Sequence, residues 1–267
     1  MQVHGQSAIV TGGASGLGAG VVKRLRREGI SVGILDVSVD LGEALAAETG
    51  AHFFHADVTD EQSLAKAFAG ARAVQGQERI LVCCAGIAAA IPVVTAGPDG
   101  IATHPFADFA RVIDINLLGT FRCIAMSAAG MAAQDAIDTD GQRGVVICTG
   151  SIAAEDGSVG QTAYAASKAG IAGMVLPAAR DLGELGIRVV AVHPGAFITP
   201  LLSRAPQSIA TGLANDSVFP KRCGDSREFA EMVLHICHND MVNGTTFRLD
   251  AGLRMSAAQS GLRSGGK

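Results

Sequence analysis

Aromatic residues other than phenylalanine are nearly absent from this chain, whose 267 residues include no tryptophan and one tyrosine, Tyr164. Exposed aromatic rings are what single-stranded nucleic acids stack on, so the composition argues against such a partner. Charged residues are also few, at 17%, and the formal net charge is −4. A weakly acidic protein is not drawn electrostatically to nucleic acid or to an anionic membrane. We therefore expect a small molecule as the main partner.

Cysteine pairs of the CxxC type are missing, and no histidine stands at the spacing of a zinc ligand, so we predict no metal site. Two cysteines fall in apolar runs that are typical of strands. We interpret all of them as buried, reduced thiols in a reducing compartment and expect a cytoplasmic protein. The six cysteines are Cys83, Cys84, Cys123, Cys148, Cys223 and Cys237.

Hydrophobic runs long enough to cross a membrane are not expected. The first six residues lack the charged and apolar regions of a secretory signal. Residues 80–98 carry no charge but contain Gly86, Pro92 and Gly97, three helix breakers that a membrane helix rarely combines. We therefore predict a soluble protein.

What the chain does have is a regular alternation of apolar runs and helical patterns, which is typical of βαβ units and a parallel sheet. We predict a single α/β domain with a Rossmann fold over residues 1–255, a doubly wound parallel sheet of about seven strands with helices on both faces. Strands are predicted at residues 7–10, 31–35, 51–56, 79–84, 144–148, 187–192 and 245–249, and helices at 16–28, 40–48, 60–74, 106–134, 161–185 and 227–237.

Two segments fall outside this alternation. Residues 200–220 are expected to be irregular or loosely helical and to form a substrate loop or lid. Their apolar residues could line an acyl channel or could equally pack on the domain core: Leu201, Leu202, Ile209, Leu213, Val218 and Phe219. Residues 256–267, rich in Ser and Gly, are predicted to be a flexible C-terminal tail.

A glycine-rich turn, Thr11-Gly12-Gly13-Ala14-Ser15-Gly16-Leu17-Gly18, joins the first strand to the first helix. Gly12 permits a tight turn, Gly16 lets a pyrophosphate approach the backbone, and Gly18 lets the helix lie close to the sheet. The helix N-terminus offers unpaired N–H groups and the positive end of a dipole to phosphates. In this setting, between a strand and a helix, the turn predicts dinucleotide binding, with Gly12, Ser15, Gly16, Leu17 and Gly18 at the cofactor.

Asp36 follows the second strand, 18 residues after Gly18. A carboxylate at this place can accept hydrogen bonds from the adenosine ribose and would repel a 2′-phosphate. Neither Ala14 nor Ser15 supplies the positive charge that a 2′-phosphate needs. We therefore predict NAD rather than NADP, although an Asp there can also simply cap a helix or a turn.

Tyr164 and Lys168 are four residues apart in a predicted helix, so both side chains leave the same face. A neighbouring ammonium should lower the pKa of the tyrosine towards neutrality and let it exchange a proton with an alcohol or a carbonyl. Ser151, 13 residues upstream, is a candidate hydrogen-bond partner for the substrate oxygen. From residues 164–168 alone, the alternative remains that Tyr164 and Lys168 are unrelated side chains on a solvated helix face.

These motifs together resemble the short-chain dehydrogenase/reductase family over roughly residues 7–252. The resemblance implies catalysis by Asn116, Ser151, Tyr164 and Lys168. It also implies that Tyr164 and Lys168 contact the cofactor, and that other cofactor contacts come from Asp57, Val58, Cys84, Ala85, Gly86, Pro194, Gly195, Ile198 and Thr199. The chain departs from the family where the usual Asn-Asn-Ala-Gly is Cys83-Cys84-Ala85-Gly86, at the cofactor edge.

Several further stretches resemble the type 2 3-hydroxyacyl-CoA dehydrogenase subfamily, also called 17β-hydroxysteroid dehydrogenase type 10. They are residues 84–88, 141–145, 176–182 and 243–250. The resemblance implies an NAD-dependent homotetramer that interconverts 3-hydroxyacyl-CoA and 3-oxoacyl-CoA, with Ser151, Gln161 and Tyr164 facing the substrate. Two other readings stay open: another short-chain reductase, acting on a 3-oxoacyl carrier protein, a steroid or a polyol, and a non-enzymatic NAD-binding scaffold.

Overall fold

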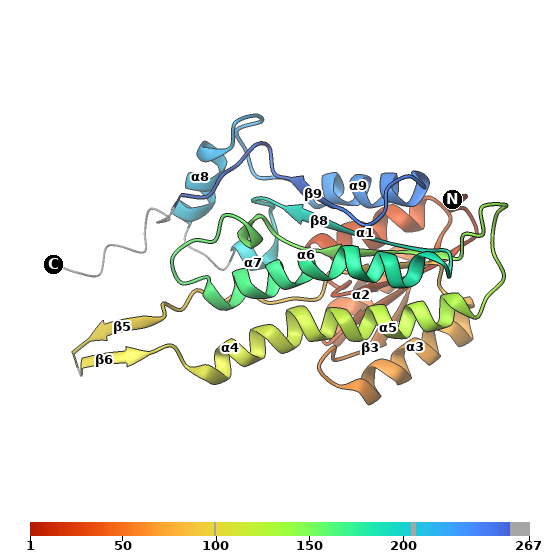
Figure 1. The fold of residues 1–267 in the computed structure, drawn as a ribbon, viewed down its shortest axis with the longest axis horizontal. Helices are drawn as coiled ribbons and strands as arrows, with labels where there is room; N and C mark the ends of the chain where they lie inside the picture. Colours follow the sequence, from red (N-terminus) through yellow and green to blue (C-terminus); the bar gives the residue numbers. More distant parts are fainter. Residues whose placement is uncertain (99, 204–206, 257–267) are drawn as a thin grey trace.

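A computed structural model describes residues 1–98, 100–203 and 207–256 of the chain, which form a doubly wound α/β domain (Figure 1). Its centre is a parallel sheet of seven strands in the order β3-β2-β1-β4-β7-β8-β9. The strands are β1 Ser7–Thr11, β2 Ser31–Asp36, β3 His52–His55, β4 Ile80–Cys83, β7 Gly144–Thr149, β8 Ile187–Pro194 and β9 Thr246–Leu249. The predicted fold class and strand number are confirmed. The predicted tail lies, from residue 257 on, outside the described residues.

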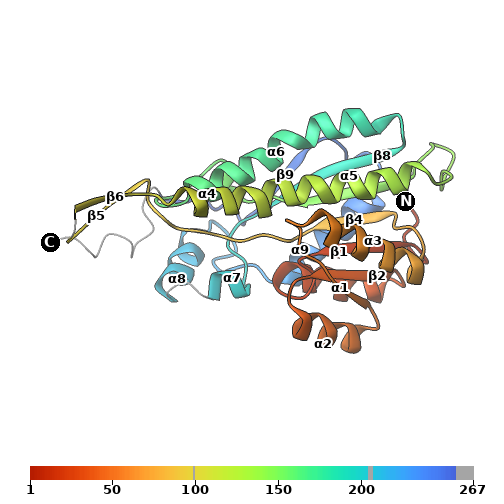
Figure 2. The same cartoon turned by 90° about the horizontal axis from the view of Figure 1, so that it is seen from below.

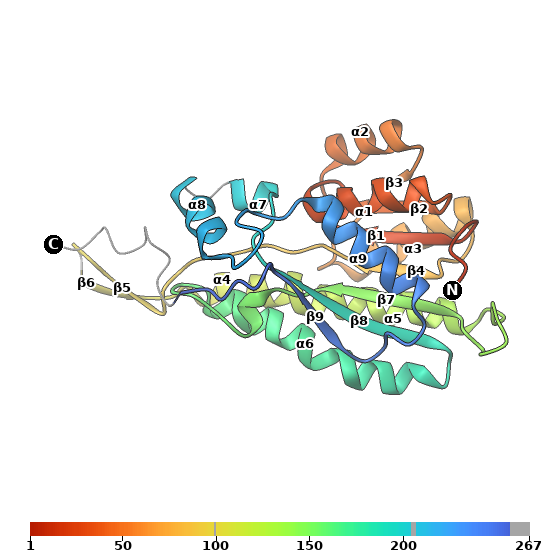
Figure 3. The ribbon, with the colours of Figure 1, turned by 90° about the horizontal axis from the view of Figure 1, so that it is seen from above.

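Helices cover both faces of the sheet, as the views from below and above show (Figures 2 and 3). On one face lie α1 Gly16–Arg27, α2 Val39–Thr49 and α9 Ser226–His238. On the other lie α3 Glu61–Gln75, α5 Gly119–Ala132 and α6 Thr162–Gly183, with α4 Phe106–Ile113 leading into α5.

The strands are apolar on both faces because both faces are covered. Successive side chains of a strand point to opposite sides, so Val10 packs towards α1 and α9 while its neighbour Ile9 packs towards α3 and α5. Phe229 of α9 and Phe68 of α3 are the largest fully buried side chains of the two layers. This double-sided core holds the strand ends, and hence the loops that follow them, in fixed positions.

The helix predicted at residues 106–134 contains a π-helical turn, Asp114–Leu118, between α4 and α5. By length and composition it is the one helix in the described part of the chain that could cross a membrane. However, it buries Asn116, Cys123 and Met131 against the rest of the domain, as a core helix of a globular protein does.

An antiparallel hairpin, β5 Val94–Gly97 and β6 Gly100–Thr103, was not predicted. It projects away from the domain beyond the start of α4 (Figure 1), and all eight of its strand residues are exposed. Its sequence, rich in Gly, Ala and Pro, resembles a loop, which is why periodicity alone did not reveal it.

The segment expected to be loosely helical forms two short helices, α7 Pro200–Ser203 and α8 Gln207–Asp216. None of the described residues of α8 is fully buried. Val218 and Phe219 are 69% and 83% exposed, so these two residues do not pack on the domain core.

Candidate active site

The carboxyl ends of β1 and β4 lie side by side at the centre of the sheet, where the strand order reverses. In open α/β sheets, ligands bind in the crevice outside this point. The glycine-rich turn leaves β1 here. Gly12 has a φ of +62°, and a Cβ on it would lie 2.5 Å from the Ala85 backbone nitrogen. A Cβ on Gly18 would lie 2.2 Å from the Gly12 carbonyl oxygen. The predicted roles of Gly12 in the turn and of Gly18 in close helix packing therefore match the structure.

The N-terminus of α1 lies at the same end of the sheet, directly after the turn that follows β1. Ser15 is its N-cap residue in extended conformation, and its side chain makes no capping hydrogen bond. The first N–H groups of α1 are thus available to an anion. Gly16 has a φ of +54°, and a Cβ on it would come within 3.5 Å of Thr199 and Pro200. The segment after β8 therefore lies against the glycine turn.

Asp36, at the end of β2, links two turns at the edge of this crevice. Its Oδ2 accepts a hydrogen bond from the Ala14 backbone N–H at 3.0 Å, and its Oδ1 accepts one from the Ser38 N–H at 2.9 Å. Each oxygen keeps a lone pair that a ribose hydroxyl could use. Asp36 is thus both the turn-capping residue and a possible ribose acceptor.

Asp57 and Val58 follow β3. Asp57 Oδ1 accepts hydrogen bonds from the Thr59 N–H at 2.8 Å and the Thr59 hydroxyl at 2.7 Å, and these bonds lower the pKa of the Asp57 carboxyl. Val58 is buried against α5, where a Cβ on Gly119 would lie 2.7 Å from its Cγ2. Its side chain supports this loop on the helix.

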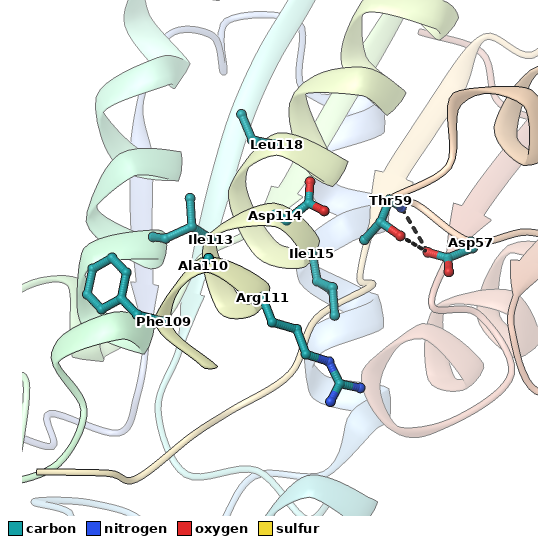
Figure 4. A pocket seen from close by; sticks show the side chains of 9 residues that line it. All are labelled: Asp57, Thr59, Phe109, Ala110, Arg111, Ile113, Asp114, Ile115 and Leu118. Carbon is teal, nitrogen blue, oxygen red and sulfur yellow. Dashed lines mark hydrogen bonds between the residues drawn. The ribbon is translucent and has the colours of Figure 1, made fainter. Parts of the chain in front are cut away.

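An open groove of about 750 Å³ runs between this loop and α4. Figure 4 shows Asp57 bonded to Thr59 on one side, with Phe109 and Arg111 of α4 and Ile115 of the π turn on the other. The groove therefore extends from Asp57 along the outer side of the long helix.

Tyr164 and Lys168 lie in the first two turns of α6, as their spacing predicts. The Lys168 Nζ atom lies 5.8 Å from the centroid of the Tyr164 ring and donates a hydrogen bond to the Thr149 carbonyl at 2.7 Å. Ser151, which follows β7, hydrogen-bonds with Tyr164, and its hydroxyl also accepts the Ala153 N–H at 3.1 Å. The three predicted side chains are thus brought together.

The expected lowering of the Tyr164 pKa is wrong in this structure. Burial raises the pKa of Tyr164, and the bond from Ser151 opposes that rise only in part. Burial also lowers the pKa of Lys168 to about 8. The sequence spacing placed the ammonium near the ring but could not show that both groups are withdrawn from water, which disfavours both charged forms.

Asn116 lies in the π turn and is fully buried. Its Oδ1 accepts the Ile87 N–H at 2.8 Å, and its Nδ2 donates to the Ile87 carbonyl at 2.9 Å and to the Ser167 hydroxyl at 3.0 Å. Both amide hydrogens are therefore used within the protein. Asn116 joins the loop after β4 to α6, the helix of Tyr164 and Lys168.

The loop Cys84-Ala85-Gly86 lies between these groups. Cys84 Sγ accepts a hydrogen bond from the Thr149 hydroxyl at 3.3 Å, and burial raises the pKa of the Cys84 thiol to about 11. A Cβ on Gly86 would lie 3.2 Å from Asn116 Oδ1 and 3.7 Å from Lys168 Nζ. The replacement of the usual asparagines therefore leaves this loop packed against Asn116 and Lys168.

The segment after β8 lies beside the glycine turn, since Thr199 and Pro200 are the nearest neighbours of a Cβ on Gly16. Pro194 ends β8, and the Gly195 N–H donates to the Leu249 carbonyl at 3.0 Å. Ile198 is 63% exposed, while the Thr199 hydroxyl accepts the Leu202 N–H at 3.3 Å. Gln161 precedes α6, and its Oε1 accepts the Ser158 N–H at 3.0 Å. This hydrogen bond stabilises the loop before α6.

Thr149 was missed in the sequence, although it supplies a carbonyl to Lys168 and a hydroxyl to Cys84. Its position at the end of an apolar strand, two residues before Ser151, was the available signal. Ser167, which bonds Asn116, was missed because it occupies an ordinary helical position. Within residues 1–98, 100–203 and 207–256, no three or more His, Cys, Asp or Glu side chains gather as a metal site would require.

The family model for short chain dehydrogenases matches residues 6–209, which is most of the chain. The chain belongs to the short-chain dehydrogenase family. It is therefore an oxidoreductase, and the predicted resemblance, fold and enzyme class are confirmed. The family also implies a nicotinamide cofactor.

Individual relatives agree with this placement. The chain is 46% identical over 255 residues to the human 3-hydroxyacyl-CoA dehydrogenase type-2, with 95% of this chain and 97% of that protein covered. It is similar to the crystal structure of 3-hydroxyacyl-CoA dehydrogenase type-2 from Mycobacterium avium, with a TM-score of 0.88, 38% identity and coverage of 96% and 99% of the two chains. A 7α-hydroxysteroid dehydrogenase complexed with NADH and 7-oxo glycochenodeoxycholic acid aligns with a TM-score of 0.83 at 28% identity, covering 95% and 96%.

Proposed function

We propose that this short-chain dehydrogenase interconverts a secondary alcohol and a ketone with NAD, and that its substrates are 3-hydroxyacyl-CoA and 3-oxoacyl-CoA. The observation that carries the proposal is the convergence of Ser151, Tyr164 and Lys168 beside the crevice at the carboxyl ends of β1 and β4. The crevice suits a dinucleotide because no side chain caps the N-terminus of α1, so its first N–H groups can bind a phosphate.

When bound, the nicotinamide supplies the hydride chemistry, and the protein supplies binding, orientation and the proton. Tyr164 gives a proton to the ketone oxygen during reduction and takes it back from the alcohol during oxidation. Its raised pKa keeps it a phenol, the proton-donating form, at neutral pH. The Ser151 hydroxyl donates a hydrogen bond to the same substrate oxygen and stabilises its developing negative charge.

Lys168 and Asn116 have supporting roles in this proposal. The buried ammonium of Lys168, fixed on the Thr149 carbonyl, favours the phenolate when Tyr164 has lost its proton. Asn116 fixes the Ile87 loop against α6, so its role in this proposal is to hold the frame of the site.

The choice of NAD over NADP is supported by Asp36. The Asp36 carboxylate accepts a hydrogen bond from the Ala14 N–H of the glycine turn. A 2′-phosphate bound at this turn would place a second negative charge close to the carboxylate, which would repel it. The remaining proposed contacts are those named from the sequence, with Asp57 and Val58 bordering the adenine, Cys84, Ala85 and Gly86 at the cofactor edge, and Pro194, Gly195, Ile198 and Thr199 at the nicotinamide side.

The substrate is proposed from the two 3-hydroxyacyl-CoA dehydrogenase relatives, with Gln161 beside Ser151 and Tyr164 at the substrate. The test compares initial rates of NADH oxidation with acetoacetyl-CoA and with a ketosteroid. A higher rate constant with the CoA thioester supports the proposal. Faster turnover of the steroid would move the enzyme to the second candidate, a hydroxysteroid dehydrogenase, which the 7α-hydroxysteroid dehydrogenase relative favours.

We further propose a cytoplasmic homotetramer. All six cysteines are free thiols, as a reducing compartment would keep them. Ala166, Ala169 and Gly173 are exposed along α6, and such small residues let a helix of another subunit approach closely. Sedimentation as a monomer at micromolar concentration would contradict the assembly.

A further inference from the structure

Arg248 of β9 is bonded to the segment that follows Ser151. Its Nη1 donates to Glu155 Oε2 at 2.9 Å and its Nη2 donates to Asp156 Oδ2 at 2.6 Å. The same guanidinium donates through Nε to Asp250 Oδ2 at 2.7 Å and through Nη2 to the Leu253 carbonyl at 2.9 Å. Only 17% of the Arg248 side chain is exposed, so this is a partly desolvated cluster rather than a surface ion pair.

The segment that Arg248 holds is short and begins at Ser151. Ser151 caps the single 3₁₀ turn Ile152–Ala154, and the Glu155 and Asp156 N–H groups both donate to the Ile152 carbonyl. Asp156 is thus only five positions after Ser151 in the sequence, with one tight turn between them. A displacement of Asp156 would therefore strain the turn that Ser151 caps.

A second line of contacts connects Arg248 to Ser151 through the sheet. Arg248 is paired with His193 in the register of β9 and β8. His193 is 1% exposed and packs so closely on Gly150 that a Cβ there would lie 2.2 Å from its Cδ2. Its Nδ1 lies 3.7 Å from Glu155 Oε1, and neither ring nitrogen has a hydrogen-bond partner among the described residues. The segment from Gly150 to Asp156 is therefore supported at both ends by β8 and β9.

We propose that Arg248 is a positioning residue for the dehydrogenase reaction, which sets the place of the Ser151 hydroxyl by holding Glu155 and Asp156 on the C-terminal strand. The inference rests on the proposed role of Ser151. Arg248 itself does not touch the reacting atoms. A guanidinium is required because it presents donors in a fixed fork to several carboxylates at once, whereas an ammonium cannot span them.

The test is a double-mutant cycle on turnover with acetoacetyl-CoA and NADH, made from Arg248→Lys and Ser151→Ala. If Arg248 acts through Ser151, Arg248→Lys lowers kcat about tenfold in the native background and less than about twofold in the Ser151→Ala background. The Kd for NADH, measured by cofactor fluorescence, is expected to stay within about twofold in every variant. Equal losses of kcat in the two backgrounds, or no loss in the first, would overturn the proposal.

Arg254→Lys is the matched control, because Arg254 also bonds Asp250 Oδ2, at 3.2 Å, but contacts neither Glu155 nor Asp156. It should leave kcat unchanged. If Arg248→Lys does not fold, Asp156→Asn replaces it in the cycle, since it removes one charge at nearly constant shape. A Ser151→Ala enzyme with native turnover would instead refute the proposed role of Ser151, and the inference with it.

Discussion

The ammonium of Lys168 lies 5.8 Å from the centre of the Tyr164 ring, while its own hydrogen bond goes to the Thr149 carbonyl. A partly buried phenol thus lies beside a buried ammonium. Burial moves the two pKa values apart, since it raises that of the Tyr164 phenol and lowers that of the Lys168 ammonium to about 8. This arrangement gives the first two predictions.

Tyr164 should titrate above pH 10 in the cofactor-free enzyme, because burial disfavours the phenolate. The measurement is the near-ultraviolet absorbance of tyrosinate, which reports this residue alone since the chain has one tyrosine and no tryptophan. Ser151→Ala should raise the pKa further by removing a bond that favours the phenolate. Tyr164→Phe is the blank, and tyrosinate absorbance well below pH 10 in the native enzyme would contradict this prediction.

Lys168 should lose its proton at a pH of about 8 in the folded enzyme. Between about pH 8 and 10.4 the unfolded chain then binds more protons than the folded one, so this group makes the free energy of unfolding rise with pH in that window. The direct measurement is a carbon-13 NMR titration of the lysine Cε resonances. The chain has five lysines, and a Lys168→Met variant assigns the resonance. Titration of Lys168 at the pH of the other lysines would refute the shift.

Asp36 should make NADH a better cofactor than NADPH by at least about tenfold in kcat/KM, since a 2′-phosphate would lie close to its carboxylate. Asp36→Asn keeps one oxygen for the backbone N–H bonds of Ala14 or Ser38 and removes the charge. Asp36→Asn should narrow the difference in kcat/KM between NADH and NADPH. Asp36→Ala should narrow it too, with a larger loss of stability. Preference of the native enzyme for NADPH would contradict the role of Asp36.

Asn116→Ala should destabilise the fold by about 1–3 kcal/mol, because it leaves the partly buried Ile87 N–H and carbonyl without their partner. Asn215, exposed on α8, is the matched control, and its change to Ala should cost less than about 0.5 kcal/mol. Denaturant unfolding measures both values. Equal stability of the two variants would show that the Asn116 bonds do not hold the loop.

Much of this site could be predicted because its residues are close in sequence or follow strands. The glycine turn, Asp36 and the Tyr164–Lys168 pair are local patterns, and strand ends in a parallel sheet meet at one edge. Contacts between distant segments could not be predicted in this way. The link from Arg248 to Asp156 joins residues 92 positions apart, and the Asn116–Ser167 bond joins residues 51 apart.

The direction of the Tyr164 pKa shift was predicted wrongly, and the β5–β6 hairpin was not predicted, for different reasons. A pKa depends on how far a group is removed from water, which the spacing of Tyr164 and Lys168 does not reveal. The hairpin is uncharged and exposed along its described strands, and strands are recognised in a sequence by the side they bury.

The most direct test of the account is the rate of NADH oxidation by acetoacetyl-CoA, measured for the native enzyme and for Tyr164→Phe under the same conditions. The account predicts ready turnover by the native enzyme and a loss of at least about 100-fold in kcat for the variant, with NADH binding retained. Native-like turnover by Tyr164→Phe would contradict the assignment of Tyr164 as the acid and base of the reaction.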